Sequence, residues 1–104
     1  MMQVHSSTVQ DATVLRCDGR LTMVAAPALK SAIDEVVESG ATHVVIDLSE
    51  TSFVDSSGLA GSLESGGDLR IAEPQEQVRM VLALTNLDRI LQPFDRLEDA
   101  VHGW

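Results

Sequence analysis

The sequence is poor in residues that form cross-links or bind metals. It has one cysteine, Cys17, and three histidines scattered along the chain, whereas a zinc site usually needs about four such ligands. Cys17 cannot form a disulfide within the chain, and the alternation of its strand predicts that it points into the core as a small apolar residue. We therefore expect no disulfide, no metal, no cofactor and no reactive thiol.

Basic residues are also few. The chain has 7 lysines and arginines against 16 aspartates and glutamates, a net charge of -9, and Lys30 is its only lysine. Nucleic acids and anionic membranes are bound by clustered Lys and Arg, but the arginines here are spread along the chain. We expect neither as a partner. The acidic surface is typical of a soluble protein, and the alternative, a face for a basic partner, stays open.

Long apolar runs are missing as well. No segment reaches the roughly 18 apolar residues that suggest a membrane-spanning helix, and the start, MMQVHSSTVQ, has no pattern of a secretion or transit signal. We therefore expect a cytoplasmic protein. With 104 residues, 44% of them hydrophobic, the sequence suits one domain with one core, spanning residues 1–104.

The spacing of apolar residues predicts an α/β fold. Residues 2–9 and 12–18 are rich in β-branched residues and are separated by a short turn, which predicts an antiparallel hairpin. An amphipathic helix follows, with Pro27 in its first turn and Gly40 after its end. Residues 43–48, HVVIDL, are apolar on both faces, which is typical of a central strand.

The second half of the chain continues this alternation. It predicts in turn a weak helix, a strand, a longer helix, an edge strand and a final helix, at residues 58–65, 68–74, 75–87, 89–94 and 95–104. Asp95 is the expected cap of the last helix. Strand, helix, strand units pair in parallel with right-handed crossovers, so we expect a mixed sheet with helices mainly on one face. Residues 43–48 should lie inside this sheet and 90–94 near an edge.

A polar turn, FVDSSGLAGSLESGG at residues 53–67, follows the most apolar run of the chain. The turn from a parallel strand into a helix is where α/β proteins place their chemistry, because backbone N–H groups and the helix dipole converge there. Asp55 can cap the helix by accepting a hydrogen bond from an N–H one or two residues on, with Ser56 and Ser57 in the first turn. Gly58 leaves room, so that one serine hydroxyl stands open to a visiting protein.

Three kinds of chemistry can be compared for this turn. A nucleophilic serine needs a base within reach and a Gly-x-Ser-x-Gly turn, and a phosphate loop needs a lysine that is absent here, since Lys30 lies far upstream. We therefore expect no catalytic residue. A phosphorylation site fits, because a phosphate at a helix start is tolerated and adds about −1.5 to −2 charges. The alternative is a capping serine that is never modified.

The stretch VVIDLSETSFVDSSGLAG resembles the anti-sigma factor antagonists, whose domain, the STAS domain, is shared with the cytoplasmic tails of sulfate transporters. In that family a strand ending in Asp-Leu is followed by an Asp-Ser-Ser-Gly-Leu turn. CDGRLT is similar to the family's Gly-x-Leu turn, and VRMVLALTNLDRILQPFDRLEDAV is similar to its closing helix, edge strand and last helix. The resemblance covers nearly the whole chain and implies a single STAS-like domain.

The resemblance also implies a function. Ser57 matches the residue that an anti-sigma factor with serine kinase activity phosphorylates, and Asp55 matches the acidic residue beside it. In this family the unphosphorylated antagonist binds the anti-sigma factor and frees a sigma factor. Phosphorylation breaks that binding, and a phosphatase restores it. The resemblance thus implies a regulatory protein that is not an enzyme. It also implies that Asp55, Ser56, Gly58 and Leu59 surround the phosphosite and contact the partner.

Two features depart from the family pattern. Thr22 stands where an acidic residue usually follows Gly-x-Leu, and the helix after SSGL is shorter than usual by about two turns, roughly 7 residues. Gly61 weakens this helix further, since an interior glycine costs about 1 kcal/mol. An alternative function keeps the fold: a non-switching scaffold or accessory subunit, for example of a lipid-transport complex.

Overall fold

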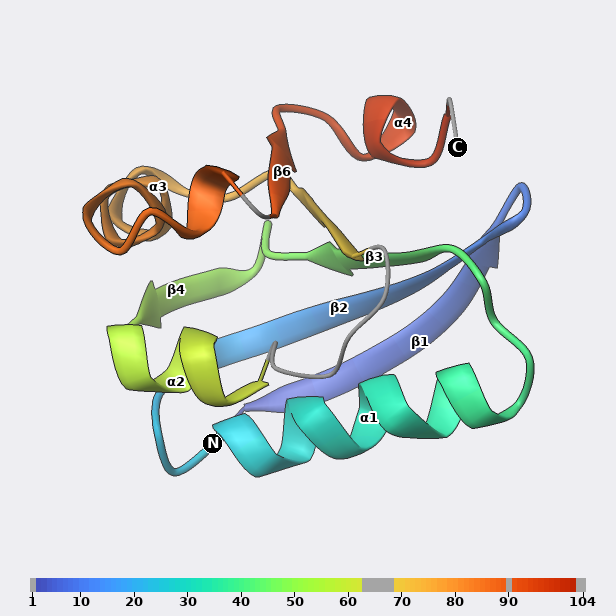
Figure 1. Cartoon of the computed structure of the whole chain (residues 1–104), viewed down its shortest axis with the longest axis horizontal. Helices are drawn as coiled ribbons and strands as arrows, with labels where there is room; N and C mark the ends of the chain where they lie inside the picture. Colours follow the sequence, from blue (N-terminus) through green and yellow to red (C-terminus); the bar gives the residue numbers. More distant parts are fainter. Residues whose placement is uncertain (1, 63–68, 90, 103–104) are drawn as a thin grey trace.

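The computed structural model describes residues 2–62, 69–89 and 91–102, which are built around a six-stranded sheet (Figure 1). The strands are β1 (Gln3–Val9), β2 (Ala12–Leu21), β3 (Val44–Asp47), β4 (Thr51–Val54), β5 (Leu69–Ala72) and β6 (Gln92–Phe94). The helices are α1 (Ala26–Glu38), α2 (Ser56–Ser62), α3 (Glu76–Leu84) and α4 (Leu97–Ala100), with a 3-10 turn, η1 (Leu87–Arg89), after α3. Within these residues, no helix has the length and hydropathy to cross a bilayer.

The sheet is mixed, as the sequence predicts. β1 and β2 form the antiparallel hairpin, and the sheet then continues in parallel through β3, β5 and β6, in the order β1-β2-β3-β5-β6. β3 lies between β2 and β5, and all its residues are buried, so the interior position predicted for 43–48 is confirmed. β6 ends the sheet, which confirms the predicted edge strand near 90–94.

Helices cover the two faces of the sheet unequally. On one face Leu15, Ile46 and Ile71 stand in register on β2, β3 and β5 and share a core with side chains of α1, α2 and α3. On the opposite face Val45 and Ala72 belong to a smaller core that includes α4. Figure 1 shows α1 and α4 on opposite sides of the sheet. The prediction of helices mainly on one face is therefore confirmed.

β4 is missing from the element order that the sequence predicts, and this is a correction. β2 extends beyond the predicted 12–18, and its residues 19–21 pair in parallel with β4, past the segment that pairs with β3. Thr51 of β4 is fully buried although it is polar, because its hydroxyl donates a hydrogen bond to the Cys17 carbonyl oxygen at 2.7 Å. β4 has four residues, two of which are a threonine and a serine, so the alternation of apolar and polar residues is too short to predict a strand.

The last helix begins differently from the prediction. Asp95 does not cap α4, because its carboxylate pairs with Arg79 of α3. The N–H of Leu97, the first residue of α4, instead donates a hydrogen bond to Glu73 Oε2 at 2.9 Å. Glu73 follows β5, far from α4 in the sequence, so no local pattern could identify it as the residue that receives this N–H.

Cys17 is fully buried, which confirms its predicted orientation and offers a test of the packing. Burial, followed by the negative charges of Asp47 and Asp18, raises the pKa of its thiol from 9.0 to about 12. Between these pH values the folded protein keeps the thiol neutral while the unfolded chain ionises, so this thiol lowers the stability as the pH rises above 9. We expect iodoacetamide to label Cys17 only as fast as the protein unfolds. Rapid labelling of the native protein would contradict this burial.

Candidate functional site

The serine pair lies where β4 ends and α2 begins (Figure 1). Asp55 connects the two elements, and its N–H donates a hydrogen bond to the Leu21 carbonyl oxygen at the end of β2, at 3.2 Å. The sequence places this turn directly after the 43–48 strand, but the structure inserts β4 between them. The turn still leaves the carboxyl end of a parallel strand, because β4 runs parallel to β2.

Asp55 caps α2, as the sequence predicts. Its carboxylate Oδ1 accepts a hydrogen bond from the Gly58 N–H at 2.5 Å, and its carbonyl oxygen accepts one from the Leu59 N–H at 3.1 Å. The capped amide lies three residues on, rather than the predicted one or two, which is a common geometry for an N-cap aspartate. These two bonds fix the start of the helix and therefore the directions of the serines.

The first turn of α2 has an outer and an inner side. Ser56 and Ser57 are exposed, and neither hydroxyl forms a hydrogen bond with a residue that the structure describes. Gly58 and Leu59 are buried, and Leu59 joins the main core with 0% of its surface exposed. The two inner residues therefore hold the helix in place, while the two serines face the solvent.

Gly58 lets α2 approach the turn between β2 and α1. A Cβ atom at this position would lie 2.5 Å from the Leu21 carbonyl oxygen and 2.8 Å from the Thr22 carbonyl carbon. Both are backbone atoms, so no side-chain movement can relieve the contact. The sequence assigned the room at Gly58 to a visiting protein, whereas the structure fills it with the chain's own backbone.

Gln77 of α3 holds the other side of the site, which the sequence did not reveal. Its amide oxygen accepts a hydrogen bond from the Val54 N–H at 3.0 Å, and its amide nitrogen donates one to the Val54 carbonyl oxygen at 2.9 Å. Val54 is the last residue of β4, directly before Asp55. A glutamine on a distant helix carries no sequence signal for such a contact, because it is surrounded by ordinary helical residues.

We expect Gln77→Ala to lower the free energy of unfolding by about 1 to 3 kcal/mol, since it leaves both backbone groups of Val54 without a partner. Gln75→Ala is the matched control, because Gln75 donates a single exposed hydrogen bond to the Ser49 carbonyl oxygen. It should change the stability by no more than about 0.5 kcal/mol. Urea denaturation of both variants measures the difference, and equal effects would contradict a special role for Gln77.

An exposed apolar turn adjoins the serines. Met23 and Val24 follow Thr22, which contacts α2, and their side chains are 66% and 88% exposed. Arg20, at the end of β2, lies over the ring of Phe53 in β4, 4.7 Å from its centroid. The surface around Ser57 thus combines hydroxyl groups with apolar side chains, which is a composition suited to a protein partner.

In the described part of the chain, no group of three or more His, Cys, Asp or Glu side chains is placed to hold a metal ion. The turn itself presents two exposed serines at the start of a capped helix.

Comparison with known proteins gives the family. Residues 3–100 match the model of the STAS domain. The anti-sigma-F factor antagonist RsfB of Mycobacterium tuberculosis is 34% identical over 96 residues, covering 86% of this chain and 79% of RsfB. The crystal structure of an anti-sigma factor antagonist from Mycobacterium paratuberculosis has a TM-score of 0.84 at 30% identity, covering 97% of this chain and 92% of that chain.

A second solved structure extends the likeness in fold. The unphosphorylated form of the anti-sigma factor antagonist SpoIIAA has a TM-score of 0.71 at 22% identity, covering 97% of this chain and 93% of that chain. At this identity the match concerns the fold alone. The family match spans every element from β1 to α4, including the turn with the two serines. The chain therefore belongs to the STAS domain family, and resembles within it the members named anti-sigma factor antagonists.

Proposed function

We propose that this STAS domain is an anti-sigma factor antagonist whose binding is switched by a phosphate on Ser57. One observation carries the proposal: Ser57 is exposed in the first turn of α2, directly after the aspartate that caps the helix. The family match and the name of the relative RsfB, an anti-sigma-F factor antagonist, support the same function.

In the unphosphorylated state, the proposed binding face consists of Ser56, Ser57 and the apolar turn at Met23 and Val24. An anti-sigma factor that covers this face meets a neutral hydroxyl at Ser57, and its sigma factor is set free. A phosphate there adds about −1.5 to −2 charges beside the Asp55 carboxylate. The partner must then bury a charge against an acidic chain, so binding is lost until a phosphatase removes the phosphate.

The phosphate must come from another protein, because this chain has no phosphate-binding loop of its own. The proposal therefore includes an anti-sigma factor with serine kinase activity, which supplies the phosphate from ATP, and a separate phosphatase. Both act in the cytoplasm, and neither nucleic acid nor a membrane takes part.

The experiment is a phosphorylation assay with candidate anti-sigma factors from the same genome and Mg-ATP, followed by mapping of the phosphate by mass spectrometry. We expect a single phosphate on Ser57, absent in Ser57→Ala and retained in Ser56→Ala. A phosphate on a different residue, or a binding anti-sigma kinase that leaves the protein unmodified, would contradict the switch.

One observation favours a second function. The sequence between SSGL and the glycine pair Gly66–Gly67 is shorter than usual in the family by about two turns, which favours a small helical surface next to Ser57. If the partner needs little of this surface, this chain serves as a non-switching scaffold or an accessory subunit, for example of a lipid-transport complex. Affinity purification followed by mass spectrometry distinguishes the two functions, because transporter subunits would support the scaffold and an anti-sigma factor would support the switch.

A further inference from the structure

The free edges of the sheet are protected to different degrees. An edge strand presents unpaired N–H and C=O groups, which proteins usually protect by a short strand, proline, lysine or a bulge. β6 has three residues and contains Pro93, and the end of β4 is held by Gln77. β1 has seven residues, QVHSSTV, without proline or lysine, and among the described residues it pairs only with β2, in an unbroken register. β1 is therefore the edge that remains open.

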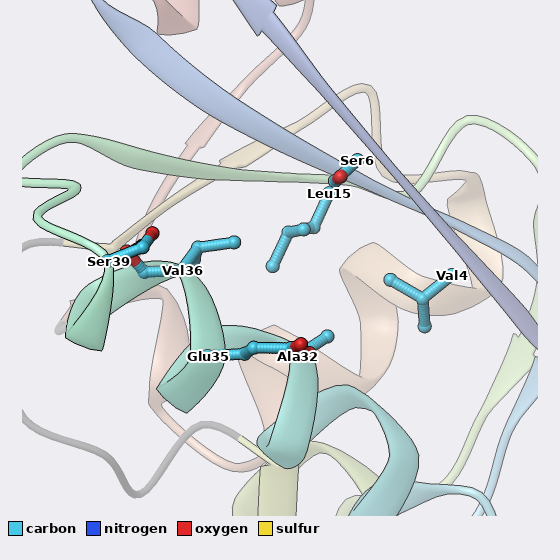
Figure 2. Close-up of a pocket in the computed structure, with 7 residues that line it drawn as sticks. All are labelled: Val4, Ser6, Leu15, Ala32, Glu35, Val36 and Ser39. Atoms are coloured by element: carbon cyan, nitrogen blue, oxygen red, sulfur yellow. Dashed lines mark hydrogen bonds between the residues drawn. The ribbon is translucent and has the colours of Figure 1, made fainter.

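A groove lies beside this open edge (Figure 2). Its volume is about 390 Å³, and it is lined by Val4, Ser6, Leu15, Ala32, Glu35, Val36 and Ser39. Val4 and Ser6 pair with Cys17 and Leu15, whose side chains belong to the core under α1, so both face α1. Ser7 alternates to the opposite face of the strand. The groove is thus apolar between β1 and α1, with hydroxyl groups at its sides.

The rim of the groove is acidic. Glu35 lines it, and Asp34 and Glu38 lie close by on the same helix. None of these carboxylates forms an ion pair with a residue that the structure describes. α1 carries one basic residue, Lys30, one turn before Asp34, and the sequence has no further lysine or arginine from residue 31 to residue 69. The acidic residues of the rim therefore favour a ligand that carries a positive charge.

We infer that β1 and this groove bind an extended, basic segment of a partner protein. The segment adds as a strand to the open edge of β1, and its backbone pairs with the free N–H and C=O groups. Side chains alternate along a strand, so an apolar side chain enters the groove against Val4 and Val36 while a lysine or arginine two residues along reaches Glu35.

This site is separate from the serine pair. α2 meets the start of α1, where a Cβ at Gly61 would lie 3.5 Å from Ala26 Cβ, whereas Glu35 is roughly 14 Å further along the helix axis. The segment can therefore bind with or without a phosphate on Ser57. A second copy of this chain is a poorer occupant, because each copy has a net charge of -9 and β1 offers no lysine or arginine to Glu35.

The test is selection of a displayed library of random 12-residue peptides on the immobilised protein, followed by affinity measurements on the enriched peptides. We expect a consensus with an apolar residue two positions from a lysine or arginine. Glu35→Lys should weaken the binding of these peptides at least about tenfold, because it places like charges together. Asp88→Lys makes the same change of charge at an exposed residue of η1, which does not line the groove, and should leave the affinity within about twofold.

A second pair of variants tests the strand itself. Ser6→Lys puts a positive charge on the groove side of β1 and should abolish peptide binding, whereas Ser7→Lys puts it on the opposite face and should retain most of it. Thermal unfolding verifies that all four variants fold. The inference is overturned if no peptide is enriched or if the two variants of each pair bind the peptides equally. It is overturned as well if the NMR chemical shifts of backbone amides that change on peptide binding belong to α2. It is also overturned if the wild-type protein forms a dimer that Ser6→Lys disrupts.

Discussion

Ser57→Asp is expected to bind the anti-sigma factor at least about 30-fold more weakly than the wild-type protein, whereas Ser57→Ala should bind like unphosphorylated wild type. In the proposed complex the partner surface covers a neutral hydroxyl, so a carboxylate at position 57 would be buried without a partner and beside Asp55. Such a charge costs at least about 2 kcal/mol, and about 1.4 kcal/mol changes a dissociation constant tenfold. Isothermal titration calorimetry with the anti-sigma factor measures both variants.

The fold should survive this added charge. The helix dipole favours a negative charge in the first turn by about 0.3 to 1 kcal/mol, so the unfolding midpoint of Ser57→Asp should remain close to that of the wild type. Ser31→Asp is the control for charge alone, because Ser31 is exposed on α1 away from the serine pair. This variant should bind the anti-sigma factor with the affinity of the wild-type protein. Equal affinities of Ser57→Asp and the wild type, or an equal loss in Ser31→Asp, would contradict a switch at position 57.

Gly58→Ala is expected to lower the free energy of unfolding by at least about 2 kcal/mol. The new methyl group would lie 2.5 Å from the Leu21 carbonyl oxygen, so α2 or the turn after β2 must move. Moving α2 disturbs the hydrogen bond between Asp55 and the Gly58 N–H. Urea denaturation gives the stability, and the rate of Cys17 labelling gives an independent measure of unfolding.

Gly61→Ala provides the matched control on the same helix. A Cβ there would make an ordinary contact with Ala26 Cβ at 3.5 Å. Because alanine favours the helix over glycine by up to about 1 kcal/mol, this variant should be as stable as the wild type or slightly more so. If both alanines destabilise the protein equally, the cost at position 58 does not come from the backbone contact.

The sequence predicted those parts of the fold that depend on local patterns. The apolar run at 43–48 predicted a buried central strand, and the Asp-Ser-Ser-Gly-Leu turn predicted a capped helix start, because both depend on residues next to one another. Residues 63–65, at the end of the helix predicted over 58–65, lie outside the described residues. The sequence also predicted that the serine pair follows a parallel strand, but it assigned that strand to residues 43–48, whereas the pair follows β4.

The parts that the sequence did not predict depend on contacts between distant residues. β4 forms because Thr51 finds the Cys17 carbonyl oxygen and because β2 is long enough to pair with two strands in succession. Gln77 holds Val54 from another helix, and Glu73 receives the first N–H of α4 in place of Asp95. In each case the two partners meet only in the folded protein. The residues next to them in the sequence therefore give no sign of the contact.

The contact at Gly58 has a consequence for how this sequence can change. The atoms that exclude a side chain there are backbone atoms of Leu21 and Thr22, and every amino acid has these atoms. No second mutation at those two positions can therefore make room for a larger residue at 58. The three atoms nearest to such a Cβ include no side-chain atom of Thr22, so the type of residue at position 22 does not decide this contact. As the sequence changes over evolution, the glycine beside Ser57 should therefore be kept, while the residue at position 22 can vary.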